Sequence, residues 1–245
     1  MKFAPRCASR WVVIDRPCRR TPAERLGSFR WRLRPQSGRE VSARQQAAER
    51  EKLREKAVLV NTIFENKVDQ LRDMVKRLDG ALSKAGIRYQ VIGGLAVFCH
   101  VDGIDPLAAR LTRDVDVAID KRDLQRIADA VKPIGLVYRH VAGIDMLVEA
   151  AAPKARSAVH MVFVNEKVRP TDPEPIPGFS EPTRTTEGFF IAPVADLVRM
   201  KLTSFRLKDK VHIQDMDSVG LITPEIENGL PAVLRGRLKE VRATE

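Results

Sequence analysis

Two stretches, Tyr89-Gln-Val-Ile-Gly-Gly94 and Thr112-Arg-Asp-Val-Asp-Val-Ala-Ile119, decide what fold this sequence can form. The first predicts a short strand that ends in a glycine turn, with a short helix over 95–101 after it. In the second, Val115, Val117 and Ile119 alternate with other residues, which predicts a strand over 114–119 with these three side chains on one face. We therefore expect two consecutive strands whose ends carry glycine on one and aspartate on the other.

The segments around these strands alternate between helical and strand patterns. Upstream, apolar residues from Leu53 to Leu82 recur at steps of three and four and predict a long helix over 42–86. Downstream, the patterns predict a helix over 121–132 capped by Asp120, strands over 136–141, 145–150 and 158–164, and helices over 193–205 and 209–219. This order is typical of an α/β (α+β) fold, with a mixed sheet of about five strands flanked by helices and a long N-terminal helix.

The positive charge of the chain belongs mainly to its first segment. The 245 residues carry 43 Lys and Arg against 32 Asp and Glu, a formal net charge of +11. Residues 1–50 hold 13 of these basic residues against 4 acidic ones, whereas the remainder holds 30 against 28. We therefore expect a basic extension over 1–40, a main domain over 41–222 and a polar tail over 223–245. The charge of the main domain gives no reason to regard it as a nucleic-acid-binding domain.

The composition excludes several classes of protein. Apolar residues make up 44% of the chain and charged residues 31%, which is an ordinary globular composition. No apolar run approaches the roughly 18 residues of a membrane-spanning helix, and the Arg-rich start lacks the apolar stretch of a secretory signal. Three cysteines without a Cys-x-x-Cys pair, and four histidines without ligand spacing, argue against a disulfide framework and a zinc site. The compartment that we expect is the reducing cytoplasm.

Asp114 and Asp116 are the residues that point most directly to chemistry. They stand two positions apart on a predicted strand, so their carboxylates project from the same face. A divalent cation between them would relieve their repulsion, and Mg²⁺ prefers oxygen ligands that it shares with substrate phosphates. Gly93-Gly94 lets the backbone approach a phosphate at the start of a helix, where free N–H groups favour an anion. Together these features predict a site for a magnesium–nucleotide complex.

Gly93-Gly94 followed by Arg110-Leu-Thr-Arg-Asp-Val-Asp116 resembles the signature of the DNA polymerase β-type nucleotidyltransferase superfamily. The likeness is strongest to the minimal nucleotidyltransferases and to abortive-infection toxins of bacterial toxin–antitoxin systems, and it covers residues 87–222. It implies a Mg²⁺-dependent transfer of a nucleotidyl group from an NTP, expected to be ATP, to a hydroxyl, with pyrophosphate leaving. It also implies a set of ligand-binding residues: Gly93, Gly94, Thr112 and Lys201 for the nucleotide, and Asp114 and Asp116 for two Mg²⁺ ions, one on the triphosphate and one on the acceptor oxygen.

One position departs from the pattern of that superfamily. The resemblance implies a third acidic residue on the strand over 158–164, but this strand contains no Asp or Glu, and His160 stands at the matching position. A histidine can act as a base, since its free pKa is about 6.5, but it is a poor ligand for Mg²⁺. We therefore group His160 with Asp114 and Asp116 as candidate catalytic residues, although a partly buried structural histidine is an equal interpretation. Glu149 is an alternative third acid.

Three functions stay open at this point. The first is a transferase that needs an NTP and an acceptor, which is a protein, a tRNA or a small molecule. The second is a catalytically degenerate module of the same fold that binds a nucleotide or a protein partner, for instance an antitoxin. The third is a nucleic-acid-binding protein that uses the basic segment 1–40. No membrane partner is expected.

Overall fold

The computed structural model of the protein describes residues 43–110, 112, 114–151 and 158–244. The expected basic extension over 1–40 lies outside the described residues. Residues Glu51–Glu245 form one compact unit. The elements are α1 (Ala43–Lys84), β1 (Tyr89–Ile92), α2 (Gly93–Asp102), β2 (Val115–Ile119), the 3₁₀ turn η1 (Lys121–Asp123), α3 (Leu124–Ala130), the 3₁₀ turn η2 (Lys132–Ile134), β3 (Leu136–Val141), β4 (Ile144–Glu149), β5 (Val159–Phe163), β6 (Thr183–Arg184), β7 (Phe190–Ile191), α4 (Val194–Ser204), α5 (Leu207–Ser218), α6 (Pro224–Asn228) and α7 (Ala232–Arg242).

A mixed sheet in the order β3-β4-β5-β2-β1-β7-β6 forms the centre of this unit. β2 lies in its middle, antiparallel to β1 on one side and parallel to β5 on the other. Because β2 and β5 are parallel, the chain must cross over between them, and it does so through α3, β3 and β4. The parallel pairing brings the first residues of β2 and β5 side by side at one edge of the sheet.

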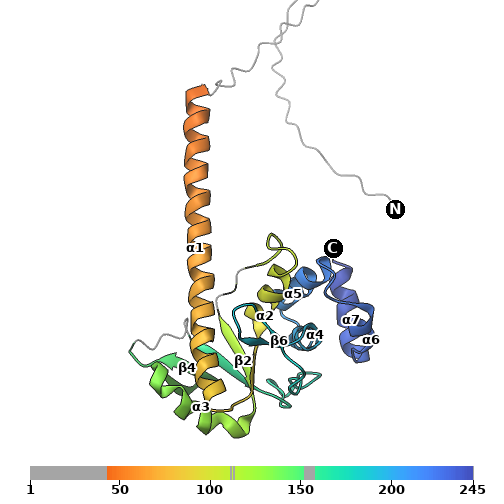
Figure 1. Ribbon diagram of the computed structural model, residues 1–245. Helices are drawn as coiled ribbons and strands as arrows, with labels where there is room; N and C mark the ends of the chain where they lie inside the picture. The colour runs from red at the N-terminus through yellow and green to blue at the C-terminus, as the bar shows by residue number, and fades with distance from the viewer. Residues whose placement is uncertain (1–42, 111, 113, 152–157, 245) are drawn as a thin grey trace, which may run out of the picture. The chain divides into compact units, whose positions relative to one another are not determined.

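Helices cover the two faces of the sheet. On one face, the Tyr89 hydroxyl of β1 donates to Asp79 of α1 at 2.7 Å, and the apolar side of α1 from Val68 to Leu82 is buried. On the other face, α4 lies opposite Ile92 and lines a pocket with it. α2, α4 and α5 contact one another, and α7 contacts α4 and α5. Figure 1 shows this helical group at one end of the sheet, with α3 at the other end.

The mixed α/β fold that the sequence predicts is confirmed, including the long N-terminal helix and the five main strands. The two-residue strands β6 and β7 were not expected, because so short a segment shows no alternation. Gly93 and Gly94 open α2 directly instead of forming a separate turn before it. Among the described residues, no helix combines the length and the apolar character that a bilayer crossing needs.

The C-terminal segment differs from the expected polar tail over 223–245. It forms α6 and α7, and the side chains of Leu234, Leu238 and Val241 are buried in the main apolar cluster. From α7, Arg237 Nη1 donates to the carbonyl oxygens of Leu202 at 2.7 Å and Thr203 at 2.8 Å, near the end of α4. The segment is therefore part of the packed domain, and it supports the helix that carries Lys201.

Candidate active site

Gly93 and Gly94 let two other residues approach the start of α2. Gly93 has a φ of +71°, which favours glycine, and a Cβ at this position would collide with the carboxylate of Asp116. A Cβ on Gly94 would lie 2.6 Å from the hydroxyl oxygen of Thr112. The first N–H groups of a helix have no partner within the helix. The glycine pair thus places the N-terminus of α2 directly beside Thr112 and Asp116.

A row of side chains crosses the sheet at this point. Ile92 of β1 is the register partner of Asp116, and Asp116 is the register partner of His160 on β5. Partners in register share a face of the sheet, and His160 Nδ1 lies 3.3 Å from Asp116 Oδ1. Asp114, half-buried just before β2, is near enough for its charge to act on His160. The structure therefore gathers six predicted residues: Gly93, Gly94, Thr112, Asp114, Asp116 and His160.

The contact with Asp116 changes the acid–base character of His160. The hydrogen bond to Asp116 raises the pKa of the imidazole above its usual 6.5, although partial burial opposes this shift. The negative charges of Asp116 and Asp114 act in the same direction as the hydrogen bond. The carboxylate thus makes the imidazole a stronger base and orients its Nδ1, so that Nε2 is the ring nitrogen left for another group.

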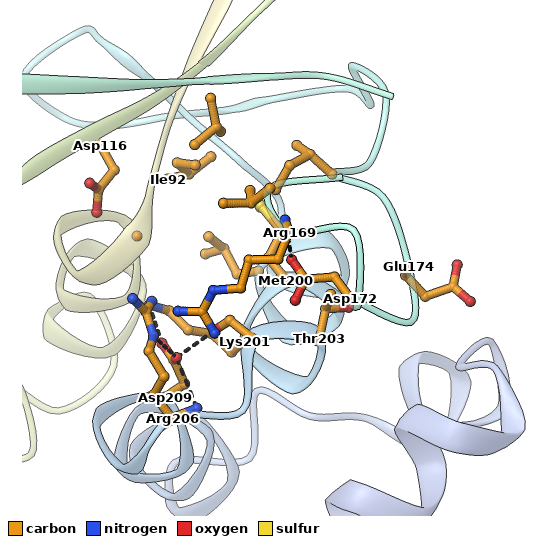
Figure 2. Close-up of a pocket in the computed structure, with 16 residues that line it drawn as sticks. Ile92, Asp116, Arg169, Asp172, Glu174, Met200, Lys201, Thr203, Arg206 and Asp209 are labelled. Carbon is orange, nitrogen blue, oxygen red and sulfur yellow. Dashed lines mark hydrogen bonds and ion pairs between the residues drawn. The ribbon is translucent and has the colours of Figure 1, made fainter. Parts of the chain in front are cut away.

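A pocket of about 200 Å³ extends from this row toward α4. Figure 2 shows Asp116 and Arg206 at one end of it, Asp172, Thr203 and Glu174 at the other, and Lys201 between the two ends. Its apolar walls come from the sheet, α4 and the loop after β5, through Ile92, Val162, Val168, Ile176, Leu197 and Met200. The predicted nucleotide-binding residue Lys201 therefore faces the same space as Gly93 and Asp116.

Lys201 is held in the pocket wall by a buried carboxylate. Lys201 is only 7% exposed, and its Nζ lies 3.2 Å from Oδ1 of Asp209, whose side chain is fully buried on α5. The other Asp209 oxygen accepts hydrogen bonds from the Ser204 hydroxyl and from Arg206, through the backbone N at 3.2 Å and Nε at 2.8 Å. Asp209 thus fixes two cationic side chains and the first turn of α5 together.

The charges of this cluster remain ionised despite burial. Burial raises the pKa of Asp209, but the hydrogen bonds from Arg206 and Ser204 and the charge of Lys201 outweigh it and hold the pKa at about 2. Burial lowers the pKa of Lys201, and the charge of Asp209 opposes that shift. The ion pair therefore keeps positive charge on the pocket wall that Lys201 shares with Asp116 and Gly93.

Sequence reasoning missed Asp209, Arg206 and Arg169. The mixed charges over 206–210 are typical of a solvated helix boundary, and only the position of Asp209 at the third residue of α5 signals a capping role. Arg169 follows β5 in a proline-rich loop, where its backbone N donates to the buried Asp172 carboxylate at 2.9 Å. In Figure 2 the Arg169 side chain extends into the pocket. No local pattern in the sequence distinguishes this arginine from a solvated one.

The residues present fit one divalent ion better than a larger cluster. Asp114 and Asp116 supply hard oxygen ligands, and Gly93 leaves open the space beside Asp116 that a Cβ would fill. Glu149, the alternative third acid, is three residues beyond Met146, the register partner of His160, so strand alternation points it to the opposite face. There it pairs with Arg77 at 3.7 Å. Among the described residues, no group of three His, Cys, Asp or Glu is placed to hold a metal.

His212 should make the stability of the domain depend on pH. It lies on α5 beside Gly94, and its Nδ1 is buried without a hydrogen-bond partner in the described part of the chain. Burial, followed by the charge of Lys201, lowers the pKa of His212 from 6.5 to about 4. Below pH 6.5, His212 binds a proton in the unfolded chain but not in the folded protein. The free energy of unfolding should therefore fall as the pH is lowered from 6.5 to about 4. Urea unfolding of wild type and His212→Gln across this range measures the effect, and equal pH slopes would contradict it.

No family model matches the sequence, and no curated protein matches it. The solved structures that resemble the chain in fold include the following three. An antigenic nucleotidyltransferase-like protein from Paracoccidioides brasiliensis is 18% identical, with 72% of this chain and 89% of that chain covered and a TM-score of 0.49. The antibiotic-resistance factor ANT(2'')-Ia is 11% identical, with 74% and 95% covered and a TM-score of 0.46. The Megavirus polyadenylate synthase is 11% identical, with 82% and 41% covered and a TM-score of 0.45.

One of these proteins is described as nucleotidyltransferase-like. At identities of 18% and below, and with TM-scores under 0.5, these likenesses assign no role to any residue of this chain. The function must be judged from the geometry of the site itself.

Proposed function

We propose that the protein is a nucleotidyltransferase that moves a nucleotidyl group from a nucleoside triphosphate to a hydroxyl acceptor. The convergence of opposite charges on one pocket carries this proposal: Asp116, Lys201 and Arg206 all line it, together with Gly93 at the start of α2. A triphosphate with its metal ion needs carboxylates on one side and cationic donors on the other. ATP is the first donor to test, and a protein, a tRNA and a small molecule are the acceptor classes.

The triphosphate would lie between the start of α2 and the wall of the pocket that Lys201 and Arg206 form, which we call the cationic wall. The N-terminal amides of α2 favour a phosphate, and the Thr112 hydroxyl beside Gly94 adds a donor. Lys201 and Arg206 would bind the phosphates that leave. Mg²⁺, held by Asp114 and Asp116, would neutralise charge on the triphosphate and polarise the phosphoryl group under attack.

The transfer would form a bond from the acceptor oxygen to the α-phosphorus and break the bond from that phosphorus to the bridging oxygen. Pyrophosphate leaves with the electron pair, and its charge is met by Lys201 and Arg206. The acceptor proton passes to His160 Nε2, because Nδ1 of this ring faces Asp116. Asp116 then stabilises the imidazolium that results.

A second candidate function is favoured by one observation, the position of His160 beside Asp116 where the resemblance implies a third carboxylate. A protein of this fold without that carboxylate would bind a nucleotide and turn it over slowly or not at all. The two candidate functions predict different rates of nucleotide turnover, but both predict that the protein binds a nucleotide.

Transfer of label from α-phosphate-labelled ATP and the other NTPs, with Mg²⁺ and each acceptor class, tests the proposal. Asp116→Asn should lower the rate by about 100-fold or more, the effect of removing a group that stabilises transition-state charge. Asp69→Asn, an exposed acid on α1, is the matched control and should leave the rate unchanged. Calorimetric binding without turnover would favour the second candidate, and the absence of any nucleotide binding would contradict both.

A further inference from the structure

The carboxylate of Asp116 is confined on two sides. Its Oδ1 lies 3.3 Å from His160 Nδ1. Its Oδ2 lies so close to Gly93 that a Cβ there would collide with it. Turning this carboxylate to bridge two ions would break the first contact or press against the backbone of α2. Asp116 can therefore offer a ligand to one ion without losing its present partners.

The positions around Asp116 provide no further carboxylate on the same row of the sheet. Two-ion phosphoryl-transfer sites hold their cations about 3.5–4 Å apart, and carboxylates that reach both ions are needed to do so. The register neighbours of Asp116 are Ile92 on β1 and His160 on β5, and the next residue along the row is Met146 on β4. An imidazole and a thioether are poor ligands for a hard cation such as Mg²⁺.

Cationic side chains of the protein, rather than a second metal ion, supply positive charge to the pocket that Asp116 lines. Lys201 is near enough for the charge of Asp116 to act on it. Arg206 and Arg169 line the same pocket, and Asp209 holds Lys201 and Arg206 in position. The cationic side chains thus line the same pocket as Asp116, and they can balance charge on a triphosphate that a second ion would otherwise balance.

Resting on the proposed function, we infer that the site binds one divalent ion with its nucleotide, and that His160 occupies the position through which a second ion would be held. Asp114 and one oxygen of Asp116 would hold that single ion. Lys201, Arg206 and Arg169, which line the same pocket, would meet the remaining charge of the nucleotide.

Counting ions per bound nucleotide tests this inference without relying on turnover. Equilibrium dialysis of the full chain with Mn²⁺ and an α,β-methylene analogue of ATP gives the excess of each in the protein compartment. We expect a ratio of about one ion per nucleotide for the wild type. His160→Asp restores a carboxylate beside Asp116 and should raise the ratio to about two, whereas His160→Asn, which removes the imidazole without adding a charge, should leave it at one.

The outcomes separate this inference from the function on which it rests. A wild-type ratio of two, or a ratio of one in His160→Asp with circular dichroism like that of the wild type, would overturn the one-ion site and leave the transferase proposal standing. No protein-bound analogue at all would remove the proposed function and the inference with it. Asp114→Asn, which should lower the Mn²⁺ ratio below one, checks that the ion counted is the one at this site.

Discussion

Gly93→Ala should abolish nucleotide transfer and also destabilise the domain. An alanine in the left-handed conformation of Gly93 costs about 1–2 kcal/mol, and its Cβ would collide with Asp116. Asp116 is a short side chain in register with His160, so it can only avoid the collision by giving up that contact. We expect transfer to fall by about 100-fold or more, which is the loss that a 1 Å misplacement of a reacting group can bring. Label transfer and urea unfolding measure the two effects.

Gly236→Ala is the matched control for this substitution. Gly236 lies inside α7, and a Cβ added there meets no atom within 4 Å. An alanine in a helix interior should stabilise the domain by about 0.5–1 kcal/mol and leave transfer unchanged. If Gly93→Ala behaved like this control in both measurements, the close approach of Gly93 to Asp116 would be wrong.

Asp209→Ala should cause the largest loss of stability among single substitutions in the site. It leaves the ammonium of Lys201 buried without its counter-charge, and it removes the acceptor for Arg206 and Ser204. Breaking a buried ion pair from one side costs about 3–5 kcal/mol. Urea unfolding measures the loss, and nucleotide binding should weaken as well because Lys201 is no longer held in the pocket wall.

The double variant Lys201→Met with Asp209→Leu distinguishes an unpaired charge from lost packing. Apolar residues of similar size can replace a buried ion pair at little cost, so the double variant should recover much of the stability that Asp209→Ala loses. Lys201→Met alone and Asp209→Leu alone complete the double-mutant cycle, and a coupling energy near zero would show that the two residues do not depend on each other. The double variant should still bind nucleotide poorly, because its pocket lacks the lysine.

The part of the site on β1 and β2 could be predicted because it depends on local rules. Alternation along β2 puts Asp114 and Asp116 on one face, and a glycine pair after β1 predicts close approach of the backbone. The place of His160 came instead from the resemblance, which implies a third acidic residue on the strand over 158–164. Each of these residues belongs to a segment whose pattern shows its secondary structure without knowledge of the packing.

The cationic wall could not be predicted, because it depends on which side of α4 and α5 faces the sheet. Asp209 stands among basic residues, and nothing local shows that its carboxylate is buried while Lys208 is exposed. Arg169 lies in a loop in which its backbone N donates to the Asp172 carboxylate. Such a contact between backbone and side chain leaves no periodic pattern in the sequence. The apolar residues Leu234, Leu238 and Val241 of α7 did have helical spacing, but the charged residues between them concealed a helix that is buried on one side only.

Because the chain crosses over between β2 and β5, the site combines residues that lie far apart in the sequence. A nascent chain that has emerged from the ribosome only as far as α3 contains Asp114, Asp116 and the glycine pair. It still lacks His160 on β5 and Lys201 on α4. Pairing of segments this far apart in sequence is slow compared with helix formation. Under the proposed function, a chain that ends after α3 should therefore bind nucleotide more weakly than the full chain.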